Sequence, residues 1–313
     1  MLIASIITTT DEQARARMNL IQWSALAARM KRKDSISQLS LLPRFLNFKR
    51  SKVCNDATLK QYLSNGWTTE ALLAQNLNAF SGDALKNSLV WAFPQAYYSV
   101  FAITLAYFQV AGFSDGQTHA SLIRKFGEEA DLGHYPQNVS FFASGGIVHK
   151  RTFENCKKAA LPSNLHFDAA DADVVDTHIA SLLGTTRQSD LCDRLGKNKE
   201  LKTQSGTRKK KFSEADYTSA GLKLGHTSVL SFLYRKRIKS NYQDIDSILS
   251  SELKADEIFP CVMRVVDCLH AIHEAYIARA LGRVAYTAIL DSLPASTAQL
   301  PNGRFNDIKP NVA

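Results

Sequence analysis

A run of 28 residues without a single charged side chain, Asn87 to Ser114, constrains this sequence more than any other feature. A helix of about 20 apolar residues is long enough to cross a bilayer. Polar residues and a proline within the run argue against a spanning helix and favour a core helix enclosed by other helices. A membrane-associated helix stays open as the alternative. We expect the helix to begin near Pro94, a first-turn position, and to end at Gly112.

The 313 residues are enough for one large domain with a sizeable core. A formal net charge of +9 attracts polyanions, which permits nucleic acid as a partner. Solvated lysine faces are the other explanation of this charge. We expect an N-terminal helical extension over 1–50, a bundle over 51–293 with an insertion at about 130–212, and a flexible C-terminal tail over 294–313.

Cysteine usage and missing motifs exclude several classes of protein. The five cysteines are dispersed, and no CxxC pair occurs, so neither a zinc ribbon nor a redox motif is indicated. The odd count and the lack of a secretory leader favour a reducing cytoplasm. No GxSxG, GxxxxGK[ST] or GxGxxG motif is present, which argues against a serine hydrolase and against nucleotide hydrolysis. We expect no cofactor and no metal.

Helical patterns cover most of the remaining chain. Residues 11–33 open with acidic residues and close with basic ones, as the helix dipole favours. Thr68 or Thr69 is predicted to cap a helix that ends near Ala79, and Thr118 to cap a short helix over 118–130. The last long helix, from Ile258 to Ile277, has apolar residues at three- and four-residue spacing.

Three stretches are expected to break the helical pattern. Pro43 interrupts the chain after the first helix. A short apolar strand is predicted at 141–149, within an irregular region that spans 133–166. Residues 196–217 are predicted to form an exposed loop. The fold class is therefore all-α, an antiparallel helical bundle with an irregular inserted region.

The chain resembles the HEPN superfamily, the higher eukaryote and prokaryote nucleotide-binding domains. The resemblance covers about 90–127 and 226–282. It consists of an AYY motif, a long apolar helix ending in Gly, a Thr-His pair before a short helix, and an arginine followed by a tyrosine and an aspartate. The matching residues are Ala96, Tyr97, Tyr98, Phe101, Gly112, Thr118, His119, Arg237, Tyr242 and Asp244.

This resemblance implies a helical bundle that forms homo-oligomers and sometimes pairs with a nucleotidyltransferase. It also implies RNA cleavage in bacterial defence or toxin–antitoxin systems. Such a metal-independent endoribonuclease uses an arginine and a histidine four to six residues apart on one helix, where imidazole transfers a proton and guanidinium stabilises the phosphorane. Arg264 and His270 fit that spacing. Short spacings of this kind also arise by chance, and the two side chains would point about 120° apart on a helix. The alternative roles are a surface arginine and a half-buried histidine.

Two basic groups are candidates for nucleic-acid binding. The first is a helical stripe of four residues: Arg235, Lys236, Arg237 and Lys239. The second is a basic block in the predicted loop: Arg208, Lys209, Lys210 and Lys211. The stripe could bind phosphate or form salt bridges on a solvated face, and the block could be a phosphate-contacting arm or a solvated tether.

Structural roles are predicted for four residues of the resemblance. Tyr97 and Tyr98 are expected to be core aromatics with hydroxyls at the bundle edge, in preference to the alternative of base-stacking platforms. His119 is expected to be a hydrogen-bond partner, and Tyr242 part of the packed bundle. His270, His273 and Glu274 form an HxxHE pattern that lacks a third metal ligand at a recognisable spacing. Two functions follow as hypotheses: an RNA-binding or RNA-cleaving HEPN-like protein, or a non-catalytic adaptor that dimerises or holds a protein partner.

Overall fold

The computed structural model describes residues 18–113, 118–145, 172–198, 201, 203, 205–207, 209–242 and 254–312. Helices dominate these residues, and an antiparallel bridge between Ala143 and Thr227 is the sole β pairing within them. The predicted all-α bundle is therefore confirmed. Of the strand predicted at 141–149, the described residues 141–145 contribute only this bridge.

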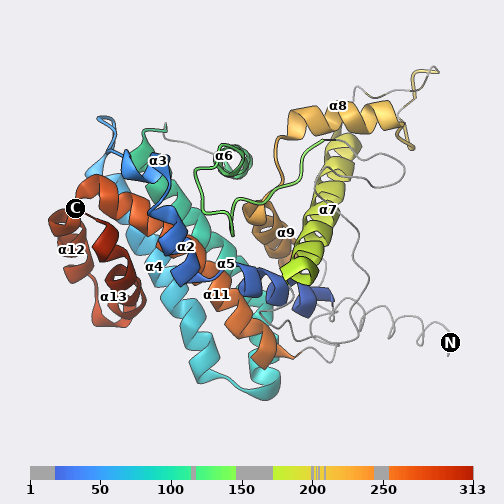
Figure 1. Ribbon diagram of the computed structural model, residues 1–313. Coiled ribbons are helices and arrows are strands. Elements are labelled where there is room, and N and C mark those ends of the chain that lie inside the picture. The colour runs from blue at the N-terminus through green and yellow to red at the C-terminus, as the bar shows by residue number, and fades with distance from the viewer. Residues whose placement is uncertain are drawn as a thin grey trace.

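Three long helices form the centre of the protein. They are α4 (Asp56–Ala79), α5 (Gly82–Ala111) and α11 (Ala255–Leu281), which lie side by side in Figure 1. The two-residue connection between α4 and α5 makes this pair antiparallel. The apolar stripe predicted for the last long helix is confirmed, because Ile258, Val262 and Val265 on α11 are fully buried.

Of the two boundaries predicted for α5, the end is confirmed and the start is wrong. Gly112 ends the helix as predicted, with a left-handed φ of +87° that favours glycine. The predicted start near Pro94 is wrong, because α5 begins twelve residues earlier, at Gly82, and Pro94 lies inside it. Leu85, Leu89 and Phe93 continue the buried face upstream of the proline, so core packing outweighs the local helix-breaking tendency.

The uncharged run of α5 is a core helix. It is long and apolar enough to cross a membrane, yet 72% of its most apolar window is buried inside the protein, as in the core of a soluble protein. Gly66 of α4 lets it approach closely, because a Cβ there would lie 2.6 Å from Ile103. At this crossing Ser99 donates a hydrogen bond of 2.9 Å to the Gly66 carbonyl.

The predicted N-terminal extension belongs to the core where it is described. Residues 18–29 are helical, followed by α2 (Arg32–Leu39) and α3 (Pro43–Leu46), with Pro43 at the first turn of α3. Trp23 is fully buried, with ring centroids 5.5 Å from Phe93 and 5.2 Å from Phe232. This segment therefore packs on the bundle instead of extending from it.

The predicted flexible C-terminal tail is wrong. Residues 283–311 form α12 (Arg283–Asp291), α13 (Ala295–Ile308) and a 3₁₀ turn (Lys309–Asn311). Helix α13 packs on α4 and α11 and buries Arg304 completely. The stretch is polar on average and buries only one face of α13, so its sequence alone does not indicate a packed helix.

Four shorter or peripheral helices lie beside the central three. They are α6 (His119–Asp131), α7 (Ala172–Lys197), α8 (Glu214–Leu224) and α9 (Val229–Tyr242). Thr118 caps α6 as predicted, accepting from the Ser121 amide at 3.2 Å. Helix α7 is 26 residues long and buries Leu182 and Leu183, so the predicted insertion at about 130–212 contains a packed helix beyond the region predicted to be irregular. Figure 1 shows α7 and α8 to one side of the bundle, with α9 between α7 and α5.

Candidate nucleic-acid interface

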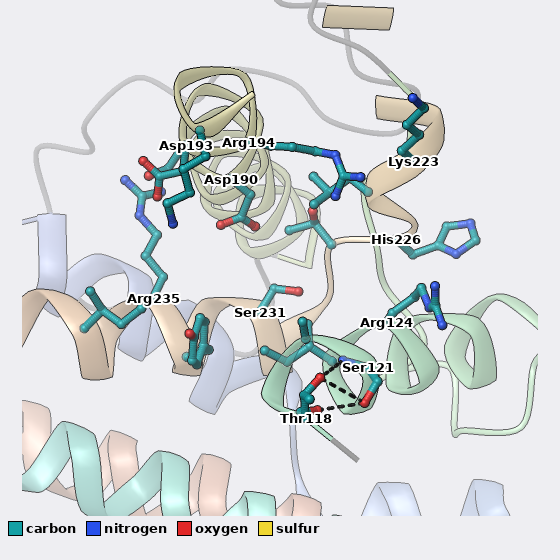
Figure 2. Close-up of a pocket in the computed structure, with 18 of the residues that line it drawn as sticks. Thr118, Ser121, Arg124, Asp190, Asp193, Arg194, Lys223, His226, Ser231 and Arg235 are labelled. Atoms are coloured by element: carbon teal, nitrogen blue, oxygen red, sulfur yellow. Dashed lines mark hydrogen bonds between the residues drawn. The ribbon is translucent and has the colours of Figure 1, made fainter. Parts of the chain in front are cut away.

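A cleft of about 680 Å³ opens between α6, α7, α8 and α9, and we call it the α6–α9 cleft. Figure 2 shows side chains from all four helices around it: Arg124, Arg194, Lys223 and Arg235 lie around the cavity, while Asp190 and Ser231 face its interior. Its volume is in the range of ligand-binding pockets.

Charge distinguishes this cleft from an ordinary surface hollow. Six basic side chains line it, from four different helices, against two carboxylates: Arg124, Arg194, Lys197, Lys223, Arg235 and Lys239 against Asp190 and Asp193. Arg194, Lys197 and Lys223 form no ion pair with an acidic side chain of the described residues. The cleft therefore has excess positive charge available to an anionic ligand.

A buried arginine holds two walls of the cleft together. Arg187 of α7 is fully buried, and its guanidinium donates to the carbonyls of Gly145 at 2.7 Å, Gly221 at 3.1 Å and Gly225 at 2.8 Å. It also donates to Thr227 Oγ1 at 3.2 Å. Because these acceptors lie in α8, in the segment that joins α8 to α9 and in the segment that follows α6, Arg187 of α7 fixes the spacing of the walls.

Helix α6 closes the other side of the cleft through a glycine. A Cβ on Gly127 would lie 2.8 Å from the His226 carbonyl, so only glycine allows α6 to approach the segment before α9 this closely. The N-terminal turn of α6, with Thr118 and Ser121, faces the cavity. The partial positive charge of this helix end adds to that of the basic side chains.

Asp190 is the acidic group inside the cleft. Burial, reinforced by the charge of Asp193, raises its pKa to about 6, against the opposing charges of Arg235 and Arg187. His226 also lines the cleft, with Nε2 3.7 Å from Asp131 Oδ2. The net charge of the cleft therefore depends on pH near neutrality.

The predicted basic stripe on α9 divides among three environments, because consecutive residues of a helix point in different directions. Arg235 and Lys239, four residues apart, line the α6–α9 cleft. Lys236 instead bonds to Asn19 Oδ1 and lies over the Phe232 ring. Arg237 lies over three tyrosine rings, 4.9 Å from the centroid of Tyr98.

The predicted basic block is not part of the cleft. Lys209 pairs with Asp216 at 2.9 Å, and Asp216 also accepts from the Ser213 amide in the capping box of α8. Lys210 and Lys211 are exposed. Arg208 lies outside the described residues.

The predicted catalytic pair does not form a surface site. Arg264 is exposed to solvent, whereas His270 on the same helix is fully buried. The Nε2 atom of His270 lies 2.9 Å from Ser99 Oγ, and its Nδ1 lies 3.1 Å from Glu70 Oε2. The angular separation expected of these two helix positions accounts for this result, and no RNA phosphate could contact His270 in this structure.

His270 belongs to a buried charge cluster, which we call the Arg304 cluster. Arg304 donates to Glu70 at 2.7 and 2.8 Å and to Glu274 at 2.7 and 3.0 Å. Trp67 Nε1 donates to Glu274 at 2.7 Å. Burial alone would raise the pKa of Glu70, but Arg304 and His270 outweigh it and hold the pKa at about 2.

The second histidine of the HxxHE pattern is also buried. His273 Nε2 lies 3.0 Å from the hydroxyl of Tyr135. Burial, and then the neighbouring His270, lower the pKa of His273 to about 3. No group of three or more metal-ligating side chains occurs within the described ranges.

The tyrosines of the AYY motif differ in exposure. Tyr97 is fully buried, and its hydroxyl lies 2.7 Å from His119 Nδ1, so both have the packing roles predicted for them. Tyr98 is 39% exposed, so the prediction of a core aromatic is wrong for this residue. Tyr242 is the last residue of α9, and its side chain lies outside the described part of the chain.

Most of the residues that line the cleft are not among the site residues predicted from the sequence. Arg124, Arg194, Lys197 and Lys223 are dispersed over a hundred positions, and each one alone resembles a solvated surface charge. A bias of basic residues toward the last turn of α7, where Arg194 and Lys197 lie, was the one available signal. Comparisons with protein-family models, with curated proteins and with solved structures each find no match for this chain.

Proposed function

We propose that this protein binds RNA through the α6–α9 cleft, as a HEPN-like component of a bacterial defence or toxin–antitoxin system in the cytoplasm. The observation that carries the proposal is the set of six basic side chains, from four helices, that converge on one cavity. Phosphates supply most of the affinity in such interfaces, through Lys and Arg side chains and helix N-termini.

Two details of the cleft fit a polyanion better than a solvated surface. Arg187 and Gly127 fix the walls in place, so the cations are held near one another without the ligand. Asp190, the carboxylate inside, has a pKa of about 6, so protonating it and removing the charge that opposes RNA costs only about 1.4 kcal/mol at pH 7. Both features lower the cost of bringing phosphate into the cavity.

The proposal is tested by the salt dependence of binding to a fluorescently labelled, unstructured RNA. The variant is Arg194→Gln combined with Lys197→Gln. We expect the slope of log affinity against log salt to fall by about one per phosphate contact removed, hence by up to about two. We expect affinity at moderate salt to fall at least tenfold.

The matched control is Lys210→Gln combined with Lys211→Gln, which removes the same charge from the exposed basic block. It should leave the slope nearly unchanged. Equal losses in the two double variants would show that net charge, and not the cleft, attracts RNA. No binding by the unmodified protein would favour the non-catalytic adaptor.

Cleavage is examined with the same RNA on a denaturing gel. The proposal does not depend on Arg264 and His270, because His270 is enclosed in the Arg304 cluster. An effect of His270→Ala on cleavage would have to be compared with its effect on folding, measured by circular dichroism.

A further inference from the structure

An exposed aromatic and cationic patch borders the α6–α9 cleft. We call it the Tyr98 platform and define it by Tyr98, Arg237 and Trp91. Tyr98 is 39% exposed and Trp91 is 65% exposed, although both belong to the core helix α5. Large aromatic side chains left in solvent on a core helix call for an explanation.

A continuous set of ring contacts connects this platform to the cleft. Tyr234 lines the cleft, and its ring lies 5.7 Å from the His119 ring in a stacked arrangement. The Arg237 guanidinium lies 5.6 Å from the Tyr234 ring and 4.9 Å from the Tyr98 ring. Arg237 therefore bridges the ring that lines the cleft and the exposed ring of Tyr98.

Trp91 extends the platform along α5. It precedes Tyr98 by seven residues, two helical turns or about 10 Å, and therefore lies on the same face of the helix. Gln95 lies between them and is tied to Asn76 by a hydrogen bond of 3.0 Å. The two exposed rings are thus presented by a rigid element.

The charge on the platform indicates the chemistry of the ligand that would bind there. Arg237 places a guanidinium beside the exposed ring, and burial and then Arg237 lower the pKa of His119 behind it, which favours the neutral imidazole. A planar cation next to an exposed aromatic ring, at the edge of a cleft with excess positive charge, matches a ligand that carries π faces on an anionic chain.

We propose that the Tyr98 platform stacks unpaired bases of single-stranded RNA whose phosphates lie in the α6–α9 cleft. This inference rests on the proposed function and assigns its substrate class, single-stranded instead of duplex RNA. Bases in a duplex present edges and not faces, so they cannot stack on Tyr98.

The test compares three RNAs of equal length: an unstructured single strand, the same strand in a perfect duplex, and the same strand with abasic sites throughout its centre. The abasic strand keeps every phosphate and loses the bases. Tyr98→Leu removes the ring, and Tyr98→Phe is the matched control that keeps it. We expect Tyr98→Leu to weaken binding of the single strand about tenfold, as the loss of one stacked base does. Binding of the abasic strand and of the duplex should not change, and Tyr98→Phe should behave as the unmodified protein.

Intrinsic fluorescence gives an independent readout. Of the three tryptophans, Trp23 and Trp67 are buried, so Trp91 alone reports on the platform. We expect the single strand, and not the abasic strand, to quench it, and Trp91→Phe to abolish the signal.

Two results would overturn this inference while leaving the proposed function intact. One is equal affinity of Tyr98→Leu and the unmodified protein for the single strand, with the cleft variant still impaired. The other is a Trp91 signal that changes with protein concentration in the absence of RNA, since a second copy of the chain would then cover the platform. If instead the cleft variant binds as tightly as its Lys210 and Lys211 control, the proposed function fails first.

Discussion

The Arg304 cluster and the α6–α9 cleft contain the same types of charged residue, but the charges have different roles in the two regions. In the cluster, one arginine and a histidine meet two carboxylates, and all four side chains are at most 1% exposed. In the cleft, six basic side chains face two carboxylates around an open cavity. The first region satisfies its charges internally, and the second leaves positive charge for a ligand.

The difference shows that enclosure decides the role of a charged residue more than its identity does. Each charge of a buried ion pair loses its hydration and depends on its partner, so the pair stabilises or destabilises the fold as a unit. A cation at an open cleft keeps its hydration and contributes little to folding. The spacing of His270 from Arg264 predicts a catalytic role, whereas its enclosure assigns it to the first region.

The largest expected effect comes from Arg304→Met. Glu70 and Glu274 would keep their burial and lose their main partner, which costs about 3–5 kcal/mol of unfolding free energy. Urea denaturation followed by circular dichroism measures this. Arg283→Met is the matched control, because Arg283 is exposed, and it should change stability by less than about 0.5 kcal/mol. A similar small change for Arg304→Met would mean that the cluster adds nothing to stability.

A smaller loss is expected for Arg187→Met, about 2–3 kcal/mol, because several carbonyls would lose a charged donor. Unlike Arg304→Met, this variant should weaken RNA binding as well, since the cleft walls would separate. Hydrogen exchange should accelerate around residues 221–228 and not in α11. Arg187→Lys keeps the charge but not the branched set of donors. Its stability and its RNA affinity should therefore lie between those of Arg187→Met and the unmodified protein. Unchanged RNA affinity in a folded Arg187→Met would contradict the wall-fixing role.

Two buried titratable groups, His273 beside the Arg304 cluster and Asp190 in the cleft, should respond to acid in opposite directions. The pKa of His273 is about 3 in the folded protein, so below pH 6.5 the unfolded chain takes up a proton that the folded protein does not. Stability therefore falls, by about 2 kcal/mol between pH 7 and pH 5. The pKa of Asp190 is about 6, so the folded protein takes up its proton first, and stability rises by about 1 kcal/mol over the same interval.

Denaturation at both pH values separates these contributions. Asp190→Asn should lose more stability on acidification than the unmodified protein, and His273→Gln should lose less. Identical pH profiles for the two variants would show that neither residue titrates as its surroundings imply.

The smallest expected effect concerns the charge of the cleft. Asp190→Asn should bind RNA about fivefold more tightly at pH 7.5, because a carboxylate that opposes phosphate is removed. The unmodified protein should approach the affinity of this variant at pH 5.5, where Asp190 is mostly protonated. Asp193→Asn is the comparison: because the charge of Asp193 helps raise the pKa of Asp190, this variant should keep a pH dependence but shift it to lower pH. Anisotropy titrations at fixed salt measure this, and an Asp190→Asn that still tightens on acidification would show that Asp190 is not the source of the pH dependence.

Local features were the most predictable from the sequence. The apolar spacing on α11, the glycine that ends α5 and the threonine that caps α6 depend on neighbouring residues, and each was recognised. The start of α5 upstream of Pro94 could not be predicted, because it depends on packing against α4 and α11 that the sequence of α5 does not show.

Long-range features could not be predicted. Arg304 lies 234 residues from Glu70, and nothing near either residue indicates the pair. The α6–α9 cleft requires four helices to be placed before its charge is apparent, and only Arg235 and Lys239 of the predicted basic stripe turned out to line it.

The separation between Glu70 and Arg304 has a consequence for synthesis on the ribosome. At about 5–20 residues per second, roughly 10–50 seconds pass between the translation of the carboxylate and that of its arginine. During this interval a nascent chain cannot pair Glu70 with Arg304 in its interior, so the final compaction of the bundle waits for α13. A chain released before that helix would carry this defect permanently, which would expose incomplete products to proteolysis.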